Sequence, residues 1–321
     1  MVLEVMMNIF KTIVCSAVIG LSGSVIAAEK VDESLSAGDA TSVRIENMRG
    51  QVQVIGWDKN EVVISGILDE EAEGLRFVDK GGIIDIEVEM PRHTRNHSNR
   101  DGSDLVIKMP EKMSVSFNGV SSNISVKDIY GGSDIQTVSG DIKLNTLKDF
   151  VESQSVSGNI TSKELSGKIT LSTVSGNIDD DKSTGRLILK AISGDIETNS
   201  TANEVFVNSV SGDAEVTLSN VDELMLSNVS GDIDASLILN KNALLKLSSV
   251  SGDFNIDFRD DVNARFSITS SAGGSLVNNI TNKKATRAKY GPSSKLNFEA
   301  GDGSANVKGS TVSGRIKVSA K

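Results

Sequence analysis

Carboxylate side chains that recur in a repeated motif are the first candidates for chemistry in this sequence. An Asp directly follows a Ser-Gly pair in five places, and stacking of these repeats would bring four of them into one ladder, namely Asp195, Asp213, Asp232 and Asp253. The carboxylates would lie about 5 Å apart and offer the oxygen ligands that Ca²⁺ prefers. The alternative is structural, because Asp suits a corner in which its side chain bonds a nearby amide. We favour the structural role and predict no metal site.

A second candidate is a basic stretch in an otherwise acidic protein. Residues 92–100 contain three arginines and both histidines of the chain, in the order Arg92, His93, Arg95, His97 and Arg100. The two histidines have metal-ligand spacing only on a helix, and two ligands without a third make a weak site. Cations in a loop suit a polyanion such as a lipopolysaccharide phosphate or an acidic glycan. We therefore predict either a solvated hairpin tip or a contact loop for a polyanion, without a metal.

Three consecutive carboxylates, Asp179 to Asp181, are the one cluster that suggests catalysis. Paired carboxylates serve as acid and base in enzymes that cleave polysaccharides. We expect these residues in a tight turn that Lys182 follows at once, with no long loops nearby to build a cleft. The single Trp and the two Tyr are too scattered to form a platform for sugars. We predict that the protein is not an enzyme and binds no cofactor.

These candidates belong to a short motif that repeats along the chain. Val-Ser-Gly-Asp-Ile or a close variant occurs eight times, with its glycine at positions 140, 158, 176, 194, 212, 231, 252 and 314. The first five of these glycines are each 18 residues apart. A fixed period of this size is typical of architectures built from stacked repeats.

Aliphatic residues occupy fixed places around each motif glycine. With the glycine counted as position 0, positions −7, −5, −2 and +2 are aliphatic, as in Ile169, Leu171, Val174 and Ile178 around Gly176. A spacing of two residues indicates a strand with one buried face. We predict that all four positions point inward and that the chain turns a corner between −5 and −2. The glycine suits a place where another strand comes close.

A single repeat cannot be stable by itself. Its four or five inward aliphatic side chains contribute at most about 1.5–3 kcal/mol each on burial, whereas ordering each of its residues costs roughly 1–2 kcal/mol. Stacking closes this gap, because neighbouring repeats share backbone ladders and bury both sides of each layer. We predict an all-β fold, a single-chain parallel β-helix (β-solenoid) with coils of about 18 residues.

The remaining β segments depart from the regular period. Residues 28–114 are expected to form an irregular β cap at the N-terminal end of the solenoid. Residues 115–321 hold the solenoid repeats, with an excursion at 277–300. We expect the C-terminus to add a final, irregular rung that caps the rod.

The N-terminus has the form of a secretory signal peptide over residues 1–27. Lys11 precedes an apolar run, and a small-residue cleavage site ends at Ala27. The alternative is a membrane anchor, but the run is shorter than the roughly 20 residues that a span needs. Cleavage removes Cys15, the only cysteine, so we expect no disulfide or thiol chemistry. We predict an exported protein of the periplasm, the cell surface or the medium.

Composition excludes further classes of partner. The net charge of −10 argues against nucleic acid and anionic membrane surfaces. Three prolines among 321 residues suit a chain of strands, because proline interrupts a backbone ladder.

The order of the segments resembles a known family. Gly50–Val54, then Leu105–Pro110, then serial Val-Ser-Gly-Asp-Ile units resemble the bacterial putative-adhesin family of β-strand-repeat proteins, over essentially all of residues 40–320. The resemblance implies a secreted or envelope-anchored β-solenoid and provides no catalytic residues. Members of the family also occur on sensor and stress-response proteins.

We therefore expect a non-enzymatic protein that offers a repetitive interaction surface, an adhesin in the broad sense. Its partner would be an envelope protein or a glycan, and weak contacts would add along a stiff face. Residues 92–100 and 283–289 are the expected local contact sites. The alternatives are a periplasmic accessory protein in envelope-stress signalling that binds another protein, and a polysaccharide-active β-helix enzyme.

Overall fold

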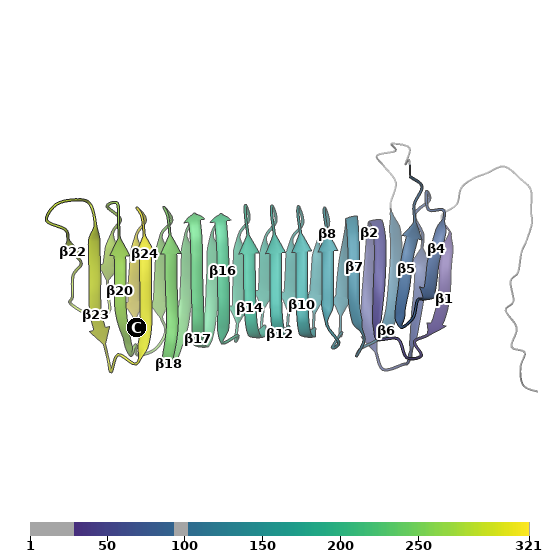
Figure 1. Ribbon diagram of the computed structural model, residues 1–321, viewed down its shortest axis with the longest axis horizontal. Coiled ribbons are helices and arrows are strands. Elements are labelled where there is room, and N and C mark those ends of the chain that lie inside the picture. The colour runs from purple at the N-terminus through teal and green to yellow at the C-terminus, as the bar shows by residue number, and fades with distance from the viewer. Residues whose placement is uncertain (1–28, 93–101, 321) are drawn as a thin grey trace, which may run out of the picture.

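The computed structural model describes residues 29–92 and 102–320. These residues form 25 β-strands and no helix, and the strands join into one mixed sheet that is wound into a rod (Figure 1). The all-β prediction is confirmed. In the described part of the chain, no helix is long and apolar enough to span a bilayer. The predicted signal peptide lies outside the described residues.

Each regular coil contains one longer and one shorter strand. β12 (Ser166–Thr173) leads through the motif corner, at positions −2 to +1, into β13 (Ile178–Asp181). After a second corner, β14 (Thr184–Ala191) begins the next coil. β12 pairs with β14 in parallel at an offset of 18 residues, so that Ile169 lies beside Leu187.

The rod has two faces, because longer strands pair with longer strands and shorter with shorter. The long-strand face contains β8 (Ser133–Thr137), β10 (Lys148–Ser155), β12, β14 and β16 (Glu204–Ser211). The short-strand face contains β9 (Ile142–Asn145), β11 (Ile160–Lys163), β13 and β15 (Ile196–Ser200).

Four long strands contribute to both faces. β2 (Ser42–Trp57) and β7 (Ser114–Lys127) continue round the motif corner, whereas β17 (Ala214–Ser230) and β18 (Ile233–Ser249) continue round the opposite corner.

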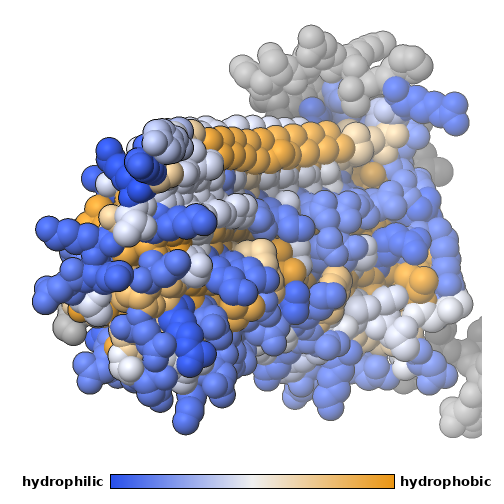
Figure 2. Space-filling view, turned by 60° about the vertical axis from the view of Figure 1, so that its left-hand side comes forward, coloured by the Kyte–Doolittle hydropathy of each residue, from blue (hydrophilic) through white to orange (hydrophobic). Residues whose placement is uncertain are grey.

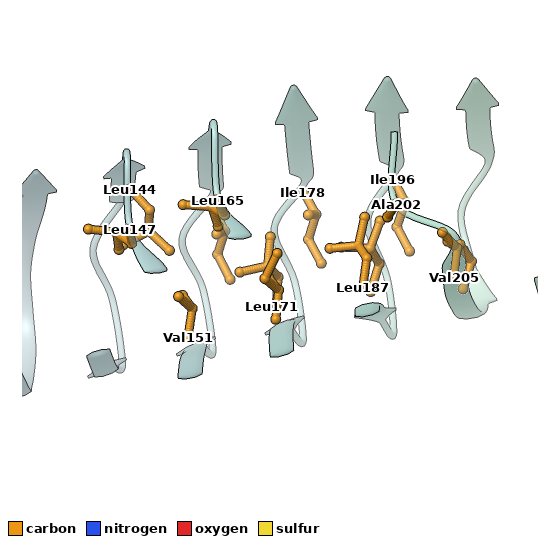
Figure 3. Close-up of a cluster of buried hydrophobic side chains, with 14 of the residues drawn as sticks. Leu144, Leu147, Val151, Leu165, Leu171, Ile178, Leu187, Ile196, Ala202 and Val205 are labelled. Carbon is orange, nitrogen blue, oxygen red and sulfur yellow. The ribbon is translucent and has the colours of Figure 1, made fainter. Parts of the chain in front are cut away.

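Aliphatic columns fill the space between the two faces. Positions −7, −5 and +2 are buried in successive coils, as for Ile169, Leu171 and Ile178, which are at most 1% exposed. Figure 3 shows such side chains from neighbouring coils lying in rows between the strands. The prediction of inward columns is confirmed at these three positions.

The prediction for position −2 is wrong. Val174 and Ile192 are 38% and 47% exposed, and the equivalent residues of the other coils are similar. The inward alternation of the strand continues to position −3, where Thr173 and Ala191 are buried. Positions −2 and −1 then both lie on the outside of the corner. The residue at position −3 is small or polar, as is typical of a surface position. For this reason the sequence does not show that position −3, and not position −2, is the buried one.

The motif glycine lies where two coils come close, as predicted. A Cβ on Gly176 would overlap the carbonyl oxygen of Gly158, and one on Gly194 would overlap that of Gly176. A side chain at Gly176 or Gly194 would therefore push neighbouring coils apart.

Antiparallel strands close the N-terminal end of the rod. β2 pairs in parallel with β7 on one side and with β5 (Ile83–Glu89) and β6 (Ser103–Pro110) on the other. Outside these, β4 (Gly74–Asp79) lies antiparallel to β5, β3 (Glu61–Ile67) to β6, and β1 (Lys30–Ser36) to β3. Asp32 and Glu33 are exposed on β1, and such charges discourage pairing of an edge strand with another chain.

The C-terminal rung does not cap the rod, contrary to the prediction. β24 (Ala305–Thr311) lies between β18 and β20 (Ala264–Ser270), and β25 (Ile316–Ala320) lies between β19 (Phe254–Phe258) and β21 (Leu276–Asn278). The end of the rod is formed instead by β23 (Ser294–Ala300), antiparallel to β20, and by β22 (Thr286–Arg287). Figure 1 shows the C-terminus within the stack. The link at 259–263 is longer than the two-residue link at 182–183 in a regular coil, which leaves room for one more rung.

Candidate functional site

The exposed residues at position −2 form one continuous row, which we call the aliphatic ridge. Its nine β-branched members are 38–47% exposed, namely Val120, Val138, Val156, Val174, Ile192, Val210, Val229, Val250 and Val312. Met48, at the same position in β2, is 48% exposed and lies beside Val120 at the end of the row. Figure 2 shows the ridge as a straight orange band along one edge of the rod. Its apolar area is on the order of 500 Å², the size of the largest apolar patch on a typical monomer, which is often functional.

Backbone hydrogen bonds hold the aliphatic ridge in place. The N–H of Ser175 donates to the carbonyl of Val156 at 2.9 Å, and that of Ser193 to Val174 at 2.8 Å. These bonds between coils fix the spacing at that of stacked strands, so the ridge is roughly 40 Å long. The serines at position −1 lie beside it on the surface. The ridge is therefore a stiff row of one chemical kind.

The ladder of carboxylates lies on the other side of these serines. The backbone N–H of Asp213 donates to a carboxylate oxygen of Asp195 at 2.9 Å, that of Asp232 to Asp213 at 2.8 Å, and that of Asp253 to Asp232 at 3.0 Å. The backbone N–H of Arg315 continues the row by donating to Asp253 at 2.7 Å, and its guanidinium donates to the same carboxylate at 2.6 Å. Each Asp therefore links two coils through its side chain, which is a structural role.

An acidic surface borders the ladder on the short-strand face. Asp179, Glu197, Glu215 and Asp234 are exposed one above another, and a shallow groove of about 510 Å³ runs between them and the ladder. Among the residues that the structure describes, no ion pair neutralises these four carboxylates, and no group of three or more His, Cys, Asp or Glu is arranged to hold a metal ion. The surface therefore repels anions.

The three consecutive carboxylates do not form a turn. They belong to β13, in which Asp179 faces the solvent and Asp180 points into the core at 1% exposure. The structure therefore separates the two groups that an acid–base pair would need to bring together.

The Asp180 carboxylate is held by hydroxyl groups inside the rod. Ser162, Ser183 and Thr198 all donate hydrogen bonds to it. Burial raises the pKa of Asp180 above its ordinary value, and these hydrogen bonds offset that rise only in part. Sequence reasoning missed this buried carboxylate because it expected a turn.

The basic stretch at 92–100 is described only at its first residue. Arg92 is exposed, whereas His93, Arg95, His97 and Arg100 lie outside the described residues.

The excursion near the C-terminus presents a second group of cations. Lys283, Lys284, Arg287 and Lys289 are exposed, and Tyr290 beside them is 86% exposed. The cations belong to the end of the rod rather than to the aliphatic ridge.

An ion-pair cluster surrounds the buried Asp85 carboxylate near the N-terminal end of the rod. The Asp85 side chain is paired with Lys80 at 2.5 Å, Arg76 at 3.2 Å and Arg44 at 3.7 Å. Burial by itself would raise the pKa of Asp85, but the hydrogen bond and charge of Lys80, together with the charges of Arg76 and Arg44, lower it below the ordinary value. The cluster joins β4 to β5, because Arg76 and Asp85 belong to these two strands.

The sequence of the chain matches a known family. A family model described as Toastrack DUF4097 matches residues 40–319. The chain belongs to the Toastrack DUF4097 family. The resemblance to β-strand-repeat proteins over residues 40–320 is thereby confirmed. The aliphatic ridge and the ladder of carboxylates both lie within the part that matches Toastrack DUF4097.

One solved structure found to be similar is that of a putative cell adhesion protein from Clostridium sporogenes. It is 11% identical in sequence, and the match covers 92% of this chain and 100% of that chain with a TM-score of 0.29. None of the curated proteins matches the chain.

Proposed function

We propose that this protein is an exported, non-enzymatic parallel β-helix with coils of about 18 residues that offers a repetitive interaction surface in the cell envelope, an adhesin in the broad sense. The observation that carries the proposal is the aliphatic ridge. Nine side chains of one kind, each about half exposed, stand at a constant spacing along one edge of the rod.

The ridge is not needed for the core. Positions −7, −5 and +2 already fill the interior, and a polar side chain would suit an exposed corner as well as Val does. A contiguous apolar row that water covers lowers solubility. Its presence in nine coils is explained if a partner covers it in the working state.

The chemistry around the ridge favours a protein partner over a glycan. Aliphatic side chains offer neither hydrogen bonds nor an aromatic platform to a sugar, whereas they pack well against an apolar protein groove. The acidic surface beside the ridge repels phosphates, nucleic acid and acidic glycans. The partner is therefore an envelope protein with an apolar, neutral or basic surface, and contacts in successive coils add in strength.

An adhesin and a periplasmic accessory protein in envelope-stress signalling would both use such a surface. Treatment of intact cells with a protease separates them, because an adhesin on the outer surface is digested and a periplasmic protein is protected. The polysaccharide-active enzyme receives no support, since Asp179 and Asp180 face opposite ways.

The proposal is tested with a ridge variant in which Val174, Ile192 and Val210 are changed to Ser. The control variant carries Lys168→Ser, Arg186→Ser and Glu204→Ser, which alter the long-strand face of the same region. We expect the ridge variant to bind membrane-envelope fragments at least tenfold more weakly than the unaltered protein, and the control variant to bind normally. Equal binding by all three proteins, or an equal loss in both variants, would contradict the proposal.

A further inference from the structure

The C-terminal rung, residues 305–320, is inserted into the stack out of sequence order, and we call it the inserted rung. On one side its Val307 lies beside Leu245 of β18, and on the other side beside Phe266 of β20. Its second strand, β25, is likewise enclosed by β19 and β21. The rung of β18 and β19 and the rung of β20 and β21 follow each other in the sequence, but the inserted rung lies between them. These two rungs form the walls of a slot that holds the inserted rung.

β20 and β21 form the rung that follows β19 in the sequence. Their inward residues would let them pack against the same side of β18 that the inserted rung occupies. Phe266, Ile268 and Ser270 are buried at the places that correspond to positions −7, −5 and −3. The stack could therefore close directly between β18 and β20 and leave the inserted rung free. This equivalence makes residues 305–320 a separable unit.

The slot is shaped for this segment. A Cβ on Gly309 would lie 3.0 Å from a methyl group of Ile268, so the facing side chain occupies the space that a larger residue would need. The Arg315 guanidinium donates to the Asp253 carboxylate at 2.6 Å, which places a cation at the end of the acidic ladder. The backbone pairs with both walls, as in recognition of a peptide by strand addition.

A short link, residues 301–304, connects β23 to the inserted rung. Residues 301–304 cross the start of β20, where the N–H of Asp302 and the hydroxyl of Ser304 donate to Asn263 at 3.1 and 3.2 Å. Gly301 and Gly303 have φ angles of 59° and 65°, which glycine adopts without strain.

We propose that the inserted rung is exchangeable and that the slot binds the inserted rung of a second copy of this chain, which gives a rung-swapped dimer. All contacts between the rung and its walls are the same in the monomer and in the dimer, and only the link at 301–304 changes its path. The inference does not rest on the aliphatic ridge or on its partner.

Cysteine cross-linking in the full chain with Cys15→Ser tests the exchange. Ser248 and Ser310 are register partners across the slot, and both are exposed. Neighbouring parallel strands bring their Cα atoms within the range that a disulfide spans. A chain with both Ser248→Cys and Ser310→Cys should form the disulfide within one molecule, which verifies the slot.

The exchange itself is measured by mixing two single variants. Chains with Ser248→Cys are mixed with chains with Ser310→Cys, partly unfolded in denaturant, refolded together and oxidised. The control mixture replaces Ser248→Cys with Ser172→Cys, which occupies the same position in an internal coil. We expect at least tenfold more disulfide-linked heterodimer in the first mixture. A yield equal to the control overturns the proposal, and so does failure of the double variant to close its disulfide.

Discussion

At the scale of single residues, the motif corner depends on side chains that bridge coils rather than on side chains that react. Asp213 accepts the backbone N–H of Asp232, and in the upstream coils Asn159 and Asn177 accept the same kind of bond. An amide oxygen therefore serves as well as a carboxylate. The recurrence of Asp or Asn at this position is explained by its hydrogen bond to the next coil, which keeps successive coils in register.

Changing Asp213 tests this structural role. Asp213→Ala removes the acceptor of a backbone N–H and should lower the free energy of unfolding by about 1 kcal/mol. Asp213→Asn keeps the acceptor and should leave stability nearly unchanged. Urea unfolding of both variants measures the difference, and an equal effect of the two changes would show that charge rather than the hydrogen bond matters.

The buried Asp180 makes stability depend on pH in a defined direction. Its pKa is raised in the folded state, so the folded protein holds the proton more tightly than the unfolded chain. The contribution of this group is fully present below about pH 4, the ordinary pKa of Asp, and is lost as the pH rises through the raised value. The unaltered protein should therefore lose stability over this range relative to Asp180→Asn, which cannot ionise.

Unfolding in urea at several values between pH 4 and pH 8 gives the measurement. The stability of Asp180→Asn relative to the unaltered protein should increase with pH. A constant difference between Asp180→Asn and the unaltered protein across the range would contradict the assignment.

At the scale of the element, the two columns beside the motif corner differ in burial although both are aliphatic. Leu187, at position −7, is fully buried, and Ile192, at position −2, is 47% exposed. The residue between them that decides the pattern is Ala191, which takes the last inward place of β14. The two residues that follow Ala191, at positions −2 and −1, therefore both point outward at the corner.

Alanine substitutions distinguish the two columns. Leu187→Ala leaves a cavity in the core and should cost about 2–5 kcal/mol in the free energy of unfolding. Ile192→Ala removes atoms that are already half in water and should cost less than about 1 kcal/mol. Chemical unfolding of both variants measures these costs. A similar loss of stability in both would mean that the side chain at position −2 is buried in the core, which would contradict the structure.

Much of the coil was predictable, because strand alternation and the 18-residue period are local features of the sequence. The inward places of Leu187 and Ile196 follow from that alternation. The outward direction of the Ile192 side chain does not follow from it, because the alternation is interrupted at the corner. The last buried residue before the corner is small or polar, Ala191 or the equivalent Thr173, so the sequence does not identify it as buried. The acidic ladder was predictable from spacing, whereas the buried position of Asp180 depends on hydroxyl groups of neighbouring coils.

The insertion of residues 305–320 could not be predicted from local pattern. Phe266 and Val307 are both inward residues of equivalent rungs, so the sequence allows either rung to follow β18. The order is decided by the length of the link at 259–263 and by the crossing at 301–304, which are properties of the assembled stack.

At the scale of the whole molecule, the aliphatic ridge is separate from the strands that close the two ends of the rod. Antiparallel strands end the rod at the N-terminus, and β23 and β22 end it at the other side (Figure 1). Between these ends, the aliphatic ridge runs along one edge (Figure 2). The acidic surface lies on the short-strand face, beyond the serines and the ladder of carboxylates. This division leaves one long surface whose chemistry repeats coil after coil and whose composition is not required by the core.

Photo-cross-linking from the aliphatic ridge tests most directly whether that surface is where a partner binds. A photoreactive amino acid is placed at Ile192 on the ridge or, as the control, at Lys190 on the long-strand face of the same coil, and each protein is irradiated with envelope fragments. We predict that the probe at position 192 forms a discrete product with an envelope protein and that the probe at 190 does not. Absence of any product from the ridge, or the same product in equal yield from both positions, would contradict the account.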